Sequence, residues 1–341
     1  MIRAAFQLSI NLLGLARFTA RRLLWTVPGL RKNVRPYVKL SLPAGLTLAG
    51  TSRGIGPIRF GGPRLGAWWS FDKLLNKIAN DPWVEGVYYR IPNARFGLTE
   101  AQLIARRLDR LRAAGKRVVC YLEQGMVRDY ILASAADTIV MAPPGRLYTF
   151  GLRLEMMFLP QALKKAGVNA QFVNLGRFKT AAHRFTRETA TPSQLRMMGH
   201  LLHGMGDAVS QRIAGRRQIS EDSARAIFDD APLSARQARR RKLIDKMAYS
   251  DQIIDTLESE TSCKRKIVMH TPAQYARAGT PDLEWKALVR PRATVAVMSL
   301  KGVIMHDGAR PPARQVITPK PVYGHSNGWP VTTGSRRWLC T

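Results

Sequence analysis

Residues 117–142, "RVVCYLEQGMVRDYILASAADTIVMA", contain two short apolar runs on either side of a helical pattern. The runs over 117–122 and 138–142 are apolar almost throughout, which is typical of strands buried on both faces of a sheet. Between them, residues 130–136 ("YILASAA") have the composition of a short packed helix. This order of strand, helix and strand predicts an α/β layered fold with mostly parallel strands and flanking helices.

The same alternation continues on both sides of this stretch. Apolar periodicity predicts further strands over 84–91 and 170–175 and helices over 71–79, 100–115 and 160–167. Ser70 is expected to cap the first of these helices. Gly115 is expected to end the second, because glycine favours the left-handed conformation that stops a helix.

A long helix is predicted after Thr191. Pro192 stands at the first helical position, and Thr191 and Gln194 have the spacing of a capping box. Apolar residues then recur at helical spacing from Leu195 to Ile213. The methionines among them are interpreted as core residues rather than as a binding surface.

The composition limits the classes of function. The 341 residues include 54 Lys and Arg against 23 Asp and Glu, and this net charge of +31 predicts attraction to polyanions such as nucleic acid or anionic lipid. The three cysteines are far apart and the six histidines form no H-E-x-x-H motif. We therefore predict no disulfide framework and no metal site.

The N-terminal residues 1–35 are interpreted as a basic amphipathic segment. No Asp or Glu precedes Asp72, and the uncharged run over 4–16 leads into an Arg-rich stretch over 17–22. The run is too short to span a bilayer, which needs about 20 apolar residues. We expect the segment to lie on an anionic membrane surface; a leader or a helix packed on the body also fits the pattern.

The stretch "LAGTSRGIGPI" (48–58) imitates a nucleotide-binding loop. Gly50, Gly54 and Gly56 have the spacing of the phosphate-binding turn of short-chain dehydrogenases. That turn must lead into a helix, whereas the prolines and glycines over 57–66 prevent one. None of the nine tyrosines has the lysine four residues later that those enzymes use. The loop is interpreted as a connection.

The segment "NLGRFKTAAHRFTRE" (174–188) contains the candidate catalytic residue, Lys179. Small and apolar neighbours such as Phe178 would shield its ammonium from water. Burial lowers the pKa of a lysine, and nearby cations such as Arg177 act in the same direction. Moving this pKa from about 10.4 to 7 requires about 4–5 kcal/mol. On spacing alone, a lysine in a basic chain is usually solvated.

Three stretches carry a resemblance to a known family. "YILASAADTIVMAPPG" (130–145) and "ALKKAGVNAQFVNLGRFKTAAHRFTRE" (162–188) closely resemble the signal peptide peptidase A family, also called protease IV. "PLSARQARRRKLIDKMAYSDQI" (232–253) is similar to a later segment of that family. The resemblance runs from about residue 70 to 255 and implies a Clp protease/crotonase-like layered fold.

The resemblance also implies an activity. Family members are serine endopeptidases that cleave leftover signal peptides in the membrane with a Ser nucleophile, a Lys general base and no cofactor. The second lysine of the family motif G-K-Y-K-S corresponds to Lys179, which is therefore the expected catalytic residue. This sequence departs from the family motif at Arg177, Phe178, Thr180, His183 and Arg184.

The nucleophile is missing at the matching position. The family's serine turn falls on "GMVRDY" (125–130), where Val127 replaces the serine and Arg128 and Asp129 replace two glycines. Valine cannot attack a carbonyl, and Ser134, the nearest hydroxyl, is interpreted as a small helix-packing residue. In long family members a second, repeated domain supplies the serine.

The chain is therefore interpreted as the lysine-bearing half of a long-form member, hydrolytically silent alone. We expect a membrane-surface segment over 1–35, the peptidase domain over 36–290, and over 291–341 the first strand of a repeat followed by an atypical tail. Residues 308–341 contain no acidic residue and no sustained periodicity, which favours a chain cut short by an altered reading frame.

Partners and location follow from the same resemblance. We expect peptide substrates, above all signal peptides, a membrane surface and other copies of the chain in a homo-oligomer, at the bacterial inner (cytoplasmic) membrane. A catalytically inactive crotonase-like scaffold and a basic nucleic-acid-binding protein are the alternatives. Specific nucleic-acid binding is not expected, because the basic run "RQARRRK" (236–242) belongs to no recognised motif. Acyl-CoA chemistry would rest on fold analogy alone.

Overall fold

The computed structural model describes a large part of the chain. The described residues are 8–9, 11–16, 18–20, 23, 34–42, 54–55, 58–59, 67–91, 97–173, 175–259, 266–278, 303–304 and 316–317. Two units divide the chain, Met1–Leu288 and Val289–Thr341. In the second, β12 (Val303–Ile304) pairs in parallel with β13 (Val316–Ile317). The rest of the predicted repeat and tail over 291–341 lies outside the described residues.

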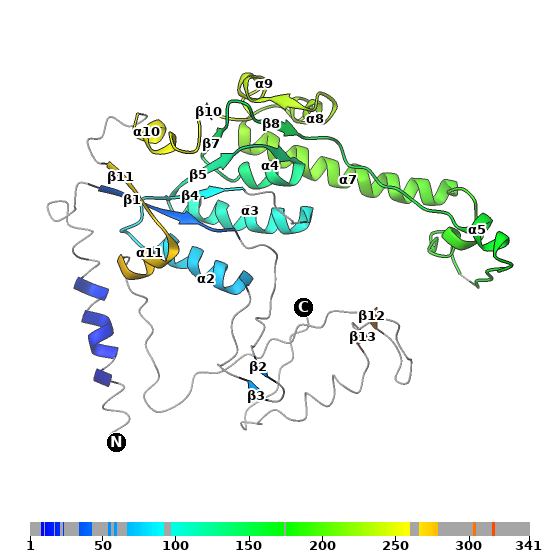
Figure 1. The fold of residues 1–341 in the computed structure, drawn as a ribbon, viewed down its shortest axis with the longest axis horizontal. Helices are drawn as coiled ribbons and strands as arrows, with labels where there is room; N and C mark the ends of the chain where they lie inside the picture. Colours follow the sequence, from blue (N-terminus) through cyan, green and yellow to red (C-terminus); the bar gives the residue numbers. More distant parts are fainter. Residues whose placement is uncertain are drawn as a thin grey trace. The chain divides into compact units, whose positions relative to one another are not determined.

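Six strands form the central sheet. In the order in which they pair, they are β10 (Lys246–Met247), β7 (Thr138–Met141), β5 (Arg117–Leu122), β4 (Gly86–Arg90), β1 (Val34–Leu40) and β11 (Lys266–His270). All five neighbouring pairs are parallel (Figure 1). The predicted α/β fold with a parallel sheet is confirmed.

The strand–helix–strand stretch over 117–142 lies at the centre of this sheet. Residues 118–122 of β5 are at most 2% exposed, and residues 139–141 of β7 are fully buried. Helix α4 (Val127–Ala133) connects the two strands, and its Leu132 carbonyl accepts a hydrogen bond of 2.6 Å from Tyr89 Oη of β4. Burial on both faces explains why this part of the sequence is apolar without alternation.

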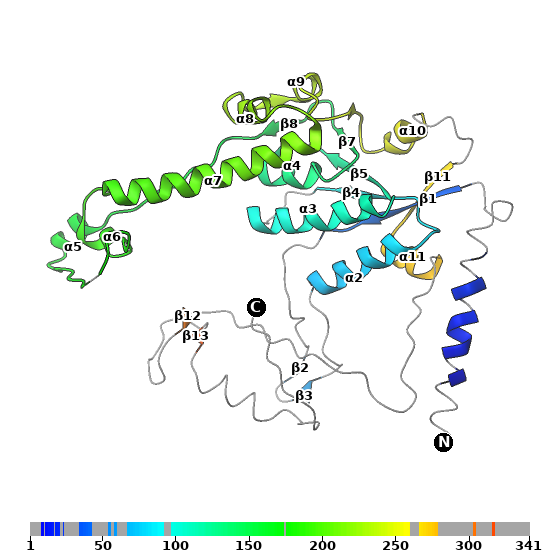
Figure 2. The ribbon, with the colours of Figure 1, turned by 180° about the vertical axis from the view of Figure 1, so that it is seen from behind.

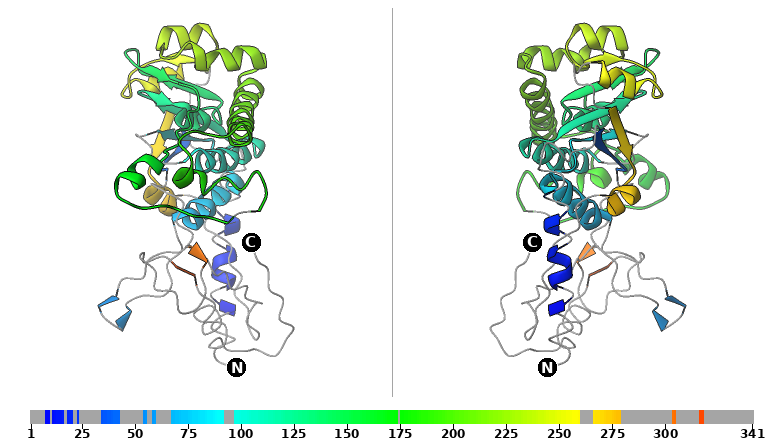
Figure 3. Two further views of the ribbon diagram at one scale, coloured as in Figure 1. Left: turned by 90° about the vertical axis from the view of Figure 1, so that its right-hand side faces the viewer. Right: turned by 90° about the vertical axis from the view of Figure 1, so that its left-hand side faces the viewer.

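Helices cover both faces of the sheet. The first core contains residues of α2 (Ala67–Asn80), α3 (Leu98–Ala113), α4 and the C-terminal half of α7 (Pro192–Arg217), which Figure 3 shows along its axis. On the other face, Ile253 and Leu257 of α10 (Ile253–Glu258) form a second core with Tyr37, Tyr88 and Tyr121. Neighbouring residues of one strand belong to different cores, as the alternation of a strand requires.

The remaining elements are short. They are α5 (Pro160–Lys165), α6 (His183–Thr186), α8 (Glu221–Asp229), α9 (Ala235–Arg240), α11 (Pro272–Ala278), the antiparallel pair β2 (Gly54–Ile55) and β3 (Ile58–Arg59), and a small sheet of β6 (Gly125–Met126), β8 (Arg146–Tyr148) and β9 (Leu233–Ser234). The arginines of α9 are solvent-exposed, and Arg241 beside them pairs with Asp230 at 2.7 Å.

Two helix ends test the sequence predictions. Helix α2 begins at Ala67, so Ser70 lies inside its first turn and does not cap it. The reason is Trp68, which is 5% exposed and extends the buried face of the helix toward its N-terminus. After α3, Gly115 has a φ of +77° and stops the helix as predicted.

The strand predicted over 170–175 is wrong. Residues 170–173 and 175 belong to no strand, and Val173 and Leu175 are 103% and 86% exposed. Their apolar and β-branched side chains match a strand pattern, but a strand also needs a hydrogen-bonded neighbour, which the sequence pattern does not supply.

The N-terminal segment is described only in part. Residues 8–9, 11–16, 18–20 and 23 are helical. Of the five leucines among them, Leu15 is half-buried and the other four are exposed: Leu8, Leu12, Leu13 and Leu23. Among the described residues, no helix has both the length and the apolar character that crossing a bilayer requires. The Gly-rich loop over 48–58 lies mostly outside the described residues.

Candidate active site

The turn between β5 and α4 is the position that the family resemblance assigns to a nucleophile. The chain leaves β5 at Leu122, passes through β6 and enters α4 at Val127. Val127 is 8% exposed and belongs to the first core. Because its side chain is apolar and packed inward, Val127 cannot attack a carbonyl carbon.

Asp129 occupies the start of the same helix. Its Oδ2 accepts a hydrogen bond of 2.9 Å from the backbone N–H of Met126, and its Oδ1 lies buried 4.0 Å from Nε of Arg128. Burial raises the pKa of this carboxyl, while the Met126 hydrogen bond and the Arg128 charge oppose that rise. A carboxylate here repels a second negative charge, so this turn is a poor place to stabilise an oxyanion.

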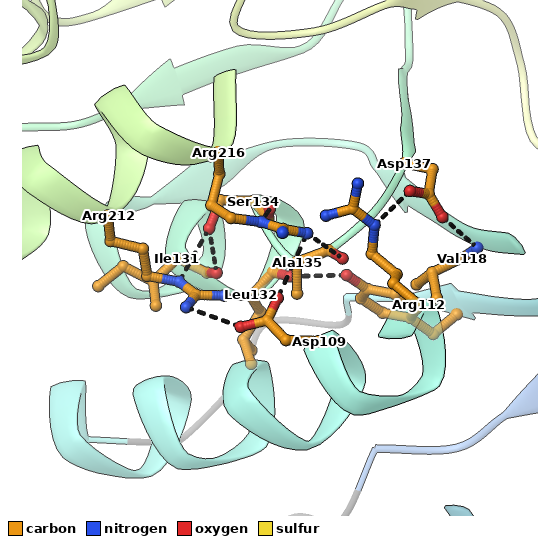
Figure 4. Close-up of polar contacts among 11 residues, drawn as sticks. Asp109, Arg112, Val118, Ile131, Leu132, Ser134, Ala135, Asp137, Arg212 and Arg216 are labelled. Carbon is orange, nitrogen blue, oxygen red and sulfur yellow. Dashed lines mark hydrogen bonds and ion pairs between the residues drawn. The ribbon is translucent and has the colours of Figure 1, made fainter. Parts of the chain in front are cut away.

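Ser134 is a packing residue, as predicted. The side chain is 1% exposed, and its Oγ donates a hydrogen bond of 2.7 Å to the carbonyl of Ile131 in its own helix (Figure 4). The same Oγ accepts a hydrogen bond of 3.1 Å from Nε of Arg212. With both roles used inside the protein, Ser134 is unsuited to nucleophilic attack.

A cluster of arginines holds the C-terminal half of α7 against α3 and the end of α4. Arg212 contacts Asp109 of α3 at 3.1 Å, and Arg216 lies 3.3 Å from the same carboxylate while donating to the Ser134 carbonyl at 3.0 Å. Figure 4 shows both guanidinium groups between α7, α3 and the end of α4. The next residue, Arg217, pairs with Asp245 at 2.6 Å. The C-terminal half of α7 is therefore firmly anchored.

The other half of α7 belongs to an arm, which we define as residues 150–205. Thr191 Oγ1 accepts a hydrogen bond from the Gln194 N–H at 3.3 Å, so half of the predicted capping box is present. The reciprocal half is missing, because the buried Oε1 of Gln194 has no hydrogen-bond partner. The 26 residues of α7 span about 39 Å. Of the described residues of the arm, only Thr180 and Gln194 are buried.

Lys179 lies on this arm, away from α4. Figures 1 and 2 show α5 and α6, the helices on either side of Lys179 in the sequence, at the far end of α7 from the anchored half. The chain reaches Lys179 through Gly176, whose φ of +94° favours glycine, and the Lys179 N–H donates to the Gly176 carbonyl at 3.1 Å. The candidate base and the α4 turn of one chain are thus held apart.

The side chain of Lys179 is exposed in the single chain. The predicted shielding by Phe178 is absent, because the Phe178 ring is itself 47% exposed and carries the guanidinium of Arg177 at 5.1 Å from its centre. Arg184 lies over Phe185 in the same way, also at 5.1 Å. Lys179 therefore has cations as sequence neighbours on both sides, and the described residues leave its side chain exposed to water.

A pocket that the sequence reasoning missed lies at the carboxyl ends of β5 and β7. Its volume is about 520 Å³, and its lining includes Tyr121, Glu123, Arg146, Tyr148 and Tyr249. Ligands of open α/β sheets bind at this edge, so the strand ends near 122 and 142 are the sequence signal that points there. Within the described residues, no three His, Cys, Asp or Glu side chains gather closely enough to hold a metal ion.

Comparison with known proteins matches the region that contains both candidate positions. Residues 110–264 match the model of peptidase family S49. The chain is 23% identical over 193 residues to the chloroplastic serine protease SPPA of Arabidopsis thaliana, covering 55% of this chain and 28% of that protein. It is 25% identical over 217 residues to Protease 4 of Salmonella typhi, covering 61% and 34%. The expected resemblance to the signal peptide peptidase A family is confirmed. The match covers only about a third or less of the length of each of these two relatives.

Solved structures show a weaker likeness. A peptidase from Plasmodium falciparum is 11% identical with a TM-score of 0.30, covering 49% of this chain and 78% of that one. An enoyl-CoA hydratase/isomerase from Marinobacter aquaeolei is 13% identical with a TM-score of 0.30, covering 55% and 63%. The α/β assignment rests on the strand order of this chain.

Proposed function

Because residues 110–264 match peptidase family S49, we propose that this chain is the base-bearing part of a serine peptidase that hydrolyses residual signal peptides. Lys179 is the general base, and the nucleophilic serine comes from a second domain or another subunit. One observation carries this division: Lys179 lies on the arm, whereas the α4 turn of the same chain contains Val127 and Asp129.

The reaction then proceeds in two steps. Neutral Nζ of Lys179 accepts the proton of the serine hydroxyl as the serine oxygen bonds to the peptide carbonyl carbon. The lysine passes this proton to the departing amine as the C–N bond breaks. Water repeats the sequence on the acyl ester, again giving its proton to Nζ, and the serine is regenerated when the ester bond breaks.

The base must be uncharged to act, and this requirement defines what a partner has to do. A solvated lysine holds its proton at neutral pH. A surface that covers the exposed Lys179 removes water from the ammonium, and Arg177 and Arg184 add repulsion of the same sign. Docking of the serine-bearing part would therefore create the nucleophile–base pair and the dry environment together.

We place homo-oligomer contacts on the shaft of the arm, which we define as residues 150–156 and 188–205. Its charges balance, with Arg153 and Arg196 against Glu155 and Glu188. Its exposed large apolar side chains are Phe150, Leu154, Leu195, Leu201 and Met205. A neutral apolar surface suits a protein partner, since burying it exposes no unpaired charge.

The proposed location is the inner membrane of a bacterium. The basic N-terminal segment over 1–35, with its exposed leucines, would hold the chain on the anionic surface where leftover signal peptides lie. The alternative is a scaffold without catalysis. It is favoured by Val127 and Asp129, which together leave the α4 turn without a nucleophile and without a free oxyanion site.

The test supplies the missing serine. The purified chain is assayed with a fluorogenic signal peptide, alone and after addition of a separately expressed serine-bearing S49 domain. We expect no cleavage by the chain alone and cleavage by the mixture. In the mixture Lys179→Ala should lower kcat by about a thousandfold, because general-base catalysis contributes 10²–10⁴. Arg187→Ala, an exposed cation of the same segment, is the matched control.

Two results would contradict the proposal. Cleavage by the chain alone that depends on Lys179 would show that the nucleophile is in this chain. A mixture that forms a complex but cleaves nothing would favour the scaffold. Circular dichroism of Lys179→Ala checks that the fold is retained, as expected for an exposed side chain.

A further inference from the structure

The outer part of the arm has an unusual composition. We define the tip as residues 157–187. These residues include six Lys and Arg (Lys164, Lys165, Arg177, Lys179, Arg184 and Arg187) and no Asp or Glu. The shaft, by contrast, has balanced charges. The two parts of the arm therefore suit different partners.

The tip also exposes large apolar side chains. They are Met157, Val168, Phe172, Val173, Leu175 and Phe178, with exposed fractions from 47% to 103%. Three of them, Phe172, Val173 and Leu175, lie within one segment that forms no strand. Exposed apolar groups in a cluster normally mark a surface that another phase or molecule covers.

The arrangement of the cations matches the apolar groups. Arg177 lies over the ring of Phe178 and Arg184 over the ring of Phe185, each at 5.1 Å from the ring centre. Phe172 stacks on Phe185 with ring centres 5.6 Å apart. Aromatic rings and guanidinium groups thus lie side by side, as they do where a protein meets lipid headgroups.

Charge decides between the two candidate partners. If two tips packed together, twelve cations would meet without one carboxylate to neutralise them. A bilayer that contains anionic lipid offers phosphates to the cations and an acyl region to the apolar side chains. The chain's net charge of +31 draws it toward such a surface from a distance.

We propose that the tip docks on anionic membranes, with Phe172, Val173 and Leu175 entering the headgroup–acyl boundary and the cations other than Lys179 at the phosphate level. This contact is separate from the N-terminal segment. It deepens the proposed function, because it holds Lys179 at the surface where a membrane-embedded peptide emerges. Membrane docking is measured without catalysis, so its failure is distinguishable from a failure of the peptidase proposal.

The experiment measures flotation of the full chain with vesicles. One set is pure phosphatidylcholine, and in the other about a third of the lipid is phosphatidylglycerol. We expect binding to the anionic set only, weakened by added salt. Val173→Asp with Leu175→Asp should reduce the partition coefficient at least about tenfold, because charged groups resist entry into the boundary. Lys164→Glu with Lys165→Glu should reduce it about 25-fold or more, since each cation near the surface contributes about fivefold.

The controls separate the tip from other surfaces. Leu103→Asp on α3 and Ile254→Asp on α10 each place one carboxylate at an exposed apolar residue outside the arm. We expect both to bind vesicles as the wild type does, because the added carboxylate lies outside the proposed contact and is screened by salt. Val173 and Leu175 are almost fully exposed, so their substitution leaves the core intact, and circular dichroism checks this.

Three results would overturn the proposal. One is equal binding of wild type and tip variants to the anionic vesicles. Another is loss of binding only in Leu12→Asp with Leu13→Asp, which would assign the contact to the N-terminal segment. The last is a fall in molar mass by light scattering in the tip variants with vesicle binding unchanged, which would make the tip an interface between copies.

Discussion

The stretch over 117–142 and the arm over 150–205 are consecutive in the sequence but opposite in their packing. In the first, β5, α4 and β7 enclose nearly all of their apolar side chains. In the second, only two described residues are buried, although nearly half of the residues over 150–205 are apolar. The difference teaches that the strand–helix–strand stretch is buried by residues of the same chain, whereas the described residues of the arm are left largely exposed.

The largest expected difference between the two regions is in the free energy of unfolding when a leucine of each is replaced by alanine. Leu132 in α4 is fully buried and Leu201 in the arm is 47% exposed. Leu132→Ala should lower the free energy of unfolding by about 3 kcal/mol, because it leaves a cavity in a packed core. Leu201→Ala should change it by less than about 0.5 kcal/mol. Urea denaturation at equal protein concentration measures both, and equal losses would show that the arm is enclosed in the free protein.

A smaller effect is expected where the two regions meet. Arg212→Ala removes the contacts to Ser134 and Asp109, but Arg216 still neutralises Asp109. We expect a loss of about 1–2 kcal/mol in the free energy of unfolding. Hydrogen exchange near the anchored half of α7 should become faster as well. Arg196→Ala, on the exposed part of the same helix, is the control and should change neither quantity.

The smallest expected effect is a pH-dependent change in stability that comes from Asp129. Burial raises the pKa of Asp129 above its ordinary value of 3.8. The folded state therefore loses stability as pH rises from 3.8 through the raised pKa, because the buried carboxyl is then ionised. Asp129→Asn keeps an acceptor for the Met126 N–H without the charge. We expect it to be more stable than the wild type at pH 7 by about 1 kcal/mol or less.

The pH dependence of this difference is the check. Thermal unfolding of both proteins should give Tm values that converge as the pH falls below 3.8 and separate toward pH 7. A Tm difference that is constant over this range, or one that favours the wild type at pH 7, would mean that the Asp129 charge is stabilised rather than penalised in the turn.

The sequence predicts the secondary structure of the central sheet and its helices better than that of the arm, for a physical reason. The strand over 117–122 is present with the predicted bounds, because its apolar run is buried by residues of the same chain. Gly115 and Thr191 also act as predicted, since caps and stops depend on local backbone geometry. Ser70 fails as a cap because the burial of Trp68 outweighs the local preference.

The failures on the arm have a common cause. The pattern over 170–175 predicts a strand, and the residues around Lys179 predict a shielded amine, but both depend on a partner that the described part of the chain does not provide. Apolar character reveals that a residue tends to be covered, not what covers it. The assignment of Lys179 to catalysis is a proposal for the same reason, as is the division into domains at 35 and 290.

The length of the anchored helix α7 sets how far the tip lies from the anchoring arginines. One end is fixed by Arg212, Arg216 and Arg217, and about 30 Å of continuous helix lies between Arg212 and Pro192. The distance from the anchored end of α7 to its N-terminal end is therefore set by the number of residues in the helix, at 1.5 Å per residue. Deleting one turn from the N-terminal half of α7 would bring the tip about 5.4 Å closer to the anchoring arginines, and every residue of the tip would be unchanged.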